Sequence, residues 1–358
     1  MRSGSPSRAA ADPARTPSHH RGRRGLAVAV TLVVLGALVA LGLAKLHPAQ
    51  VARALSRARG GWLAGAEALM VATFLARGES WFVALRSALP EARLSRGVVT
   101  RVLLIGMAGS TLAPSRAGEA ARAALIVRRV GEVRESLPRV VGSLLSQTLL
   151  NLLALALLAA LAIAHGTLPG SGSGALALAL AVPAVVVVAL VALPRVLIAR
   201  AGVARRPGRL AGIVTGSLEG VRGGLSVLSR PSTALHSGVA QLLGWACQCG
   251  SCLLVLEAMG LGARTGVAAA AAILVAVNVT AILPLTPSNV GVFQAACIAV
   301  LARFGVRADT AFAYGVVLQG LEVATALGLG VPFALREGLW PGGARPLPGP
   351  PGAGPPVT

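Results

Sequence analysis

The chain has 358 residues, of which 55% are hydrophobic and 13% are charged, a balance that excludes an ordinary soluble domain with a polar exterior. The net charge of +21 would suggest nucleic acid in a soluble protein, but the basic residues gather in tails and in short loops between apolar runs, as in membrane topology. Only 3% of residues are aromatic, so the stacking surfaces that bind unpaired bases are not expected, and we exclude nucleic acid as a partner.

The two ends of the chain differ from its middle. Residues 1–24 are polar and rich in arginine, so we expect a disordered basic tail. Residues 25–44 are apolar over a length that crosses ~30 Å of hydrocarbon. We interpret them as an uncleaved first crossing rather than a secretory signal, because the run is long and further apolar runs follow. Residues 338–358 are rich in Pro and Gly, which predicts a second disordered tail. The membrane domain is therefore expected over residues 25–337.

The apolar segments that follow the first crossing have unequal lengths. They run over about 61–76, 98–112, 137–165, 175–194, 234–259, 267–283, 291–302 and 311–335. The segment at 61–76 is short for a crossing and is expected to continue through Trp81 to Leu85. With that extension, six segments are long enough for full crossings.

Three short apolar pieces adjoin prolines. The pieces 98–112, 117–127 and 291–302 fall below the ~17 residues that a crossing needs, and they flank Pro114 or follow Pro284 and Pro287. Broken or re-entrant helices are the natural interpretation, so we expect two helical hairpins, at 98–127 and 267–302. The alternative is that Pro and Gly only kink ordinary spans, which gives ten crossings with the same terminal orientation.

The two proline-broken regions resemble each other. P-S-R-A-G begins at Pro114 and P-S-N-V-G begins at Pro287. The basic tail and the distribution of loop arginines predict that both termini are cytoplasmic, and the two hairpins then enter the membrane from opposite sides. An all-α polytopic membrane fold with six or more crossings and an inverted repeat of two hairpins is therefore expected.

The first hairpin carries the most informative charges. Arg116, Glu119 and Arg122 follow one another at i, i+3 and i+6, so they can pair along one face of a helix that starts after Pro114. Charges at membrane depth are costly and usually face a cavity, and a helix N-terminus adds a positive dipole end. Together these features suit a phosphate. The alternative is a structural ion pair at the membrane interface.

Uncharged polar residues mark the second hairpin and the helix after it. Asn289 occupies the position of Arg116 in the second repeat and Gln294 follows it, so they are candidates to coordinate a headgroup, or else to bond backbone carbonyls freed by the break. Glu322 lies one turn after Gln319 near the middle of the last segment. It is a candidate proton carrier or partner of an intramembrane arginine, against the alternative of bonding between helices.

Other polar residues suggest packing rather than chemistry. Gln147 with Asn151, and Gln241 with Gln248, form stripes that predict hydrogen bonds between helices. Glu67 lies nearer a segment end, where interfacial solvation suffices. A Ser/His/Asp set, a paired-carboxylate cleft and metal-ligand spacing are all missing from the sequence, so we expect no enzymatic activity, no cofactor and no metal.

Two stretches carry a resemblance to a known family. They are A-P-S-R-A-G-E-A-A-R-A-A-L-I-V-R-R (113–129) and L-P-L-T-P-S-N-V-G-V-F-Q-A-A (283–296), the second followed by F-G-V (304–306). The chain resembles the transmembrane region of lysylphosphatidylglycerol synthases, a family that includes stand-alone flippase-like proteins. The resemblance implies a role in moving a lipid or a lipid-linked headgroup between leaflets. The soluble aminoacyl-transferring domain of the larger members is not recognisable, so lysyl transfer is not expected.

These observations predict a flippase-like transporter of the inner (plasma) membrane. Its expected partners are membrane lipids, in particular an anionic phospholipid or a lipid-linked phosphate. The alternative is a non-transporting membrane subunit that scaffolds a lipid- or glycan-modifying enzyme. A partner enzyme and a homo-oligomer both stay open.

Overall fold

The computed structural model describes residue 53 and residues 56–112, 117–164, 219–282 and 289–338, and every regular element in these ranges is a helix. Five of these helices are long and apolar enough to cross a membrane, so the chain is a multi-pass membrane protein. They are α3 (Gly60–Ala88), α6 (Val133–Ala164), α9 (Pro231–Ala258), α10 (Gly262–Ile282) and α12 (Ala308–Arg336). The crossings predicted at 25–44 and 175–194, and nearly all of both predicted tails, lie outside the described residues.

The short helices lie where the broken hairpins were predicted. They are α4 (Arg96–Leu112), α5 (Ala117–Val130) and α11 (Val292–Ala302), and a 3₁₀ turn, η1 (Leu225–Ser229), precedes α9. Helix α10 reaches spanning length only with the residues ahead of Gly266, whose φ of 63° and ψ of −168° break the helix. Its regular part therefore begins at Val267, as predicted. The predicted extension of the first short segment is also confirmed, since α3 continues to Ala88.

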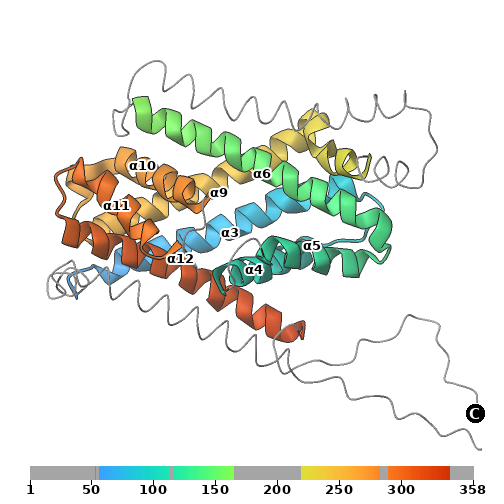
Figure 1. The fold of residues 1–358 in the computed structure, drawn as a ribbon, viewed down its shortest axis with the longest axis horizontal. Coiled ribbons are helices and arrows are strands. Elements are labelled where there is room, and N and C mark those ends of the chain that lie inside the picture. The colour runs from blue at the N-terminus through green and yellow to red at the C-terminus, as the bar shows by residue number, and fades with distance from the viewer. Residues whose placement is uncertain (1–52, 54–55, 113–116, 165–218, 283–288, 339–358) are drawn as a thin grey trace, which may run out of the picture.

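Helices α3 and α9 form the antiparallel centre of the bundle. At one end the Arg59 N–H donates to the Ala258 carbonyl oxygen over 3.0 Å, and towards the other end the hydroxyls of Ser80 and Ser237 are 3.0 Å apart. About half of the most apolar stretch of each is buried (56% and 50%), against 28% in α6 and in α12. Figure 1 shows α4 and α5 towards one end of the long helices and α10 and α11 at the other.

The described helices fall into two sets of four with reciprocal packing. In each of the sets α3 to α6 and α9 to α12, the first and last helices are longer than the two between them. Helix α4 packs against α12 of the other set, and α10 packs in the same way against α6. Every other substantial contact among these eight helices also has its counterpart when the two sets are exchanged. Each set therefore packs its second helix against the last helix of the other set.

Small residues allow the closest helix contacts. A methyl group at Gly118 of α5 would lie 2.0 Å from the carbonyl oxygen of Gly106 in α4. A methyl group at Gly330 of α12 would lie 2.4 Å from the carbonyl oxygen of Leu104 in α4. Packing through glycine is typical of membrane helices, because apolar side chains gain little by leaving lipid for one another.

The outer helices expose apolar faces. On α6, Leu153, Leu157 and Leu161 are 46%, 46% and 39% exposed, and their four-residue spacing places them on one face. Leu235 and Val239 form a similar stripe at the start of α9. Such faces are unfavourable in water and suitable for acyl chains, which agrees with a membrane location.

Candidate functional site

Arg122 of α5 is buried inside the bundle. Its side chain is 9% exposed, and its guanidinium donates a hydrogen bond of 2.5 Å to Gln147 Oε1 of α6. Its Cζ atom lies 4.1 Å from the ring centroid of Trp81 in α3, which is a cation–π contact. The guanidinium of Arg122 therefore contacts an amide from α6 and an aromatic ring from α3.

The glycine contact between α4 and α5 makes room for this arginine. A methyl group at Gly106 would lie 2.2 Å from Cγ of Arg122, so the arginine stem passes directly over the α4 backbone. Trp81 is itself fixed, because its Nε1 donates to the Ser143 hydroxyl over 3.2 Å. The surroundings of Arg122 are thus set by packing before any ligand binds.

Arg77 of α3 forms the second charged centre. Its guanidinium donates to Gln248 Oε1 of α9 over 2.6 Å and lies 5.4 Å from the Trp245 ring centroid. Arg77 occupies the same position along α3 as Gln248 occupies along α9, counted from the start of each helix. These two helices are the first of each set and together form the centre of the bundle. The charge therefore sits at the boundary between the sets.

Gln147 links the two arginines. Its Oε1 accepts from Arg122, and its Nε2 donates to the backbone carbonyl oxygen of Arg77 over 3.1 Å. We name the group of Arg77, Trp81, Arg122, Gln147 and Gln248 the central polar site.

The central polar site has positive charge that its own contacts leave available. The Arg77 and Arg122 guanidiniums are near enough to repel each other. Within the described residues, each makes its side-chain hydrogen bond to a neutral amide, and each Nε is buried without a partner. Glu322 of α12 attracts Arg77, and Glu119 attracts Arg122 from an exposed position. An anion between the arginines would relieve the repulsion.

The predicted residues of the second hairpin form a different group. Gln294 Oε1 accepts from the Gly291 N–H over 2.7 Å, and Gln294 Nε2 donates to Gln319 Oε1 of α12 over 2.7 Å. Asn289, with a φ of 57°, donates to the Thr280 hydroxyl over 3.3 Å, and its Oδ1 is buried without a partner in the described part of the chain. We name Gln294 and Gln319 the amide cluster; Asn289 bonds to Thr280 instead.

The structure brings together only part of the predicted set. Arg122 lies in the central polar site, and Glu322 lies within electrostatic reach of it, one turn along α12 from the amide cluster. Glu119 lies outside the site on the exposed face of α5. Arg116 lies outside the described residues.

Sequence reasoning missed Arg77 and its partners. The segment was expected to extend through Trp81 to Leu85 with Arg77 near the inner face of the membrane, whereas in the structure Arg77 lies inside the bundle against Gln248 and Trp245. The predicted bonding of Gln147 and Gln248 between helices is confirmed, but their partners are guanidiniums rather than other amides. An arginine inside a helix of spanning length was the signal that could have found the site.

Glu67 also differs from expectation. It was assigned to an interfacial position, but its Oε1 accepts a hydrogen bond of 2.7 Å from the Thr325 hydroxyl of α12. Its Oε2 is buried without a partner in the described part of the chain. Glu67 lies two turns inside α3, on the face that packs against α12, so its carboxyl points between the two helices.

Comparison with known families gives one match. Residues 26–330 match the lysylphosphatidylglycerol synthase TM region. The chain belongs to this family. The resemblance inferred from the two proline-containing stretches is thereby confirmed. No match was found among curated proteins or among solved structures.

As a member of the lysylphosphatidylglycerol synthase TM region family, the protein is related to membrane proteins of lipid modification and to flippase-like proteins. The matched range contains α3 to α11 entirely and most of α12. The central polar site and the amide cluster both lie within it, so both belong to the part of the chain that the family shares.

Proposed function

We propose that the protein moves a lipid, or a lipid-linked headgroup, between leaflets and binds its anionic headgroup at the central polar site. The observation that carries the proposal is the pair of guanidiniums of Arg77 and Arg122, which are linked through Gln147 and are each bound to a neutral amide. Charges inside a membrane bundle are expensive and typically mark a substrate pathway. Guanidinium groups also match phosphate geometry.

The two helix sets supply a mechanism of alternating access. We infer that α3 to α6 and α9 to α12 are an inverted repeat, because their contacts are reciprocal and their first helices are antiparallel. In transporters of this kind one repeat rocks against the other around a site near the bilayer midplane. Arg77 and Gln248 lie on α3 and α9, the first helices of the two repeats, so a rocking movement of one repeat against the other would occur around them.

The substrate class follows from the charges. An anionic phospholipid or a lipid-linked phosphate would bind between Arg77 and Arg122, with Trp81 and Trp245 limiting the movement of the guanidiniums. Arg116 and Glu119 would act at the entrance, since Glu119 is exposed. Glu322 would compete with the substrate for Arg77 and so favour release. The proposal involves transport without chemical conversion, so no enzymatic step is assigned.

The orientation in the membrane is also proposed. The excess of arginine in residues 1–24, 86–101 and 195–230 favours a plasma (inner) membrane protein with both termini in the cytoplasm. The hairpins α4–α5 and α10–α11 would then enter from opposite sides as re-entrant elements.

The experiment is a leaflet-access assay in liposomes that contain the purified full-length protein. Fluorescent anionic and zwitterionic lipids are followed with a quencher that reaches the outer leaflet only. The proposal expects movement of the anionic lipid by the wild type and its loss in Arg122→Gln. The matched control is Arg101→Gln, because Arg101 is exposed on α4 and donates only to Gly97 of its own helix.

A scaffolding subunit gives the opposite result. It would move no lipid in this assay, and its function in cells would tolerate substitution of Arg122 and Glu119 while depending on residues 195–230. Equal transport by the wild type and Arg122→Gln would show that the central polar site does not carry substrate.

A further inference from the structure

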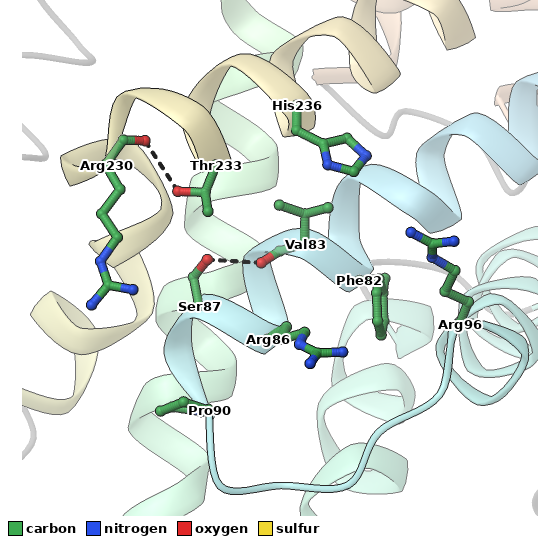
Figure 2. A pocket seen from close by; sticks show the side chains of 9 residues that line it. All are labelled: Phe82, Val83, Arg86, Ser87, Pro90, Arg96, Arg230, Thr233 and His236. Atoms are coloured by element: carbon green, nitrogen blue, oxygen red, sulfur yellow. Dashed lines mark hydrogen bonds between the residues drawn. The ribbon is translucent and has the colours of Figure 1, made fainter.

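A pocket of about 500 Å³ opens where α3 ends and α9 begins (Figure 2), and none of the residues that line it belongs to the central polar site. One part of the pocket lining is strongly basic, and another part is apolar. Arg86 of α3, Arg96 of α4 and Arg230 just before α9 contribute guanidiniums, and Phe82 and Val83 of α3 contribute apolar surface.

The charges in the pocket are only partly neutralised. Glu79 pairs with Arg96 at 3.2 Å and with the pocket residue His236 at 3.2 Å. Arg96 also lies over the Phe82 ring, 5.5 Å from its centroid. In the described ranges, neither Arg86 nor Arg230 pairs with a carboxylate. Two guanidiniums on different elements therefore line the pocket without a carboxylate partner among the described residues.

The position of the pocket suggests the kind of anion. Helices α3 and α9 are both membrane-spanning, so the place where one ends and the other begins lies at headgroup depth. A phospholipid there would place its phosphate near Arg86 and Arg230 and its glycerol and first acyl carbons against Phe82 and Val83. A soluble polyanion would leave the apolar wall unused, whereas a basic pocket between membrane helices matches a lipid headgroup.

We propose that this pocket holds an anionic phospholipid of the surrounding bilayer as a resident lipid. It is a second lipid site, and binding there requires no transport, so the inference does not rest on the proposed function. By contacting Arg86 and Arg230 together, the phosphate ties the end of α3 to the start of α9, the two central helices of the bundle.

The test is native mass spectrometry of the full-length protein in detergent micelles that contain phosphatidylglycerol or phosphatidylcholine. All proteins carry Arg122→Gln, so that no lipid held at the central polar site contributes. The parent should retain phosphatidylglycerol in preference to phosphatidylcholine. Arg86→Gln with Arg230→Gln should weaken phosphatidylglycerol binding by about thirtyfold, since two basic residues near the lipid surface are lost.

Two controls separate charge loss from misfolding. Arg86→Lys with Arg230→Lys keeps the charge and should keep most of the binding, and Arg101→Gln removes an exposed arginine outside the pocket and should change nothing. Equal retention of phosphatidylglycerol and phosphatidylcholine, or undiminished binding by the double glutamine variant, would overturn the proposal. Complete displacement by soluble glycerol phosphate at the lipid's own concentration would equally overturn it, because the apolar wall would then contribute nothing.

Discussion

The α4–α5 hairpin and the α10–α11 hairpin occupy equivalent places in the two helix sets but differ in chemistry. Helix α5 presents Arg122 to the bundle interior, whereas α11 presents Gln294, which bonds Gln319 and the start of its own helix. Both hairpins pack on the last long helix of one of the sets, α5 on α6 and α11 on α12. The architecture therefore depends on helix lengths and small residues, while the buried arginine Arg122 belongs to one half.

The largest expected effect comes from removing that charge. Arg122→Gln should slow transport of an anionic lipid by about 100-fold, because a hydrogen bond to a charged group contributes roughly 1.5–3 kcal/mol. Gln294→Met, the matched change in the other half, should slow it by no more than about fivefold, as expected for neutral groups. The leaflet-access assay measures both. Equal effects of the two substitutions would show that the halves do not differ in role.

The next effect concerns packing. Gly118→Ala places a methyl group 2.0 Å from the Gly106 carbonyl oxygen, and we expect a cost of about 1–3 kcal/mol or more. At Gly315, between α12 and α11, the nearest atom is Gln294 Cα at 3.2 Å, so Gly315→Ala should cost less. Melting temperatures in detergent measure both variants. Gly320→Ala, with no atom within 4 Å of the added methyl, is the control and should not destabilise.

Gln147→Leu tests the link between the two arginines. The substitution removes the acceptor of Arg122 and the donor to the Arg77 carbonyl, so we expect transport to fall by about tenfold. Gln241→Leu is the matched control, because Gln241 donates to Asn151 and contacts neither arginine. Its transport rate should stay near that of the wild type. A larger loss in Gln241→Leu than in Gln147→Leu would assign both effects to helix packing alone.

The smallest effect is expected at the contact between α3 and α12. Thr325→Val removes the 2.7 Å hydrogen bond to Glu67, whose other carboxyl oxygen is already buried without a partner in the described residues. We expect a loss of about 0.5–1.5 kcal/mol, visible as a lower melting temperature. Thr148→Val should leave the melting temperature unchanged, since Thr148 is exposed and donates only within α6.

The fold could be predicted closely because helix length and hydrophobicity decide it. The short pieces around Pro114 and Pro287 correspond to α4, α5 and α11, since proline and glycine interrupt helices by local geometry. The reciprocal packing could not be derived, because it depends on contacts such as Gly330 of α12 with Leu104 of α4 that hydrophobicity does not reveal.

The site was predicted less completely. The spacing put Glu119 and Arg122 on one helix face, whereas the structure buries Arg122 and exposes Glu119. Glu322 lies within electrostatic reach of Arg77, which is one of the alternatives that the sequence left open. Spacing also favoured pairing of Arg122 with Glu119 on the same helix, but its direct partners are Trp81 and Gln147 from two other helices. Periodicity along one helix describes neighbours on that helix, whereas partners across the bundle are set by tertiary packing.

The measurement that tests the central claim most directly is the charge selectivity of transport. The rate for an anionic lipid is divided by the rate for a zwitterionic lipid of the same acyl chains, in the wild type and in Arg77→Gln with Arg122→Gln. Binding of an anionic headgroup at the central polar site predicts a ratio well above one that falls to about one in the double variant. An unchanged ratio in a double variant that still transports would contradict it.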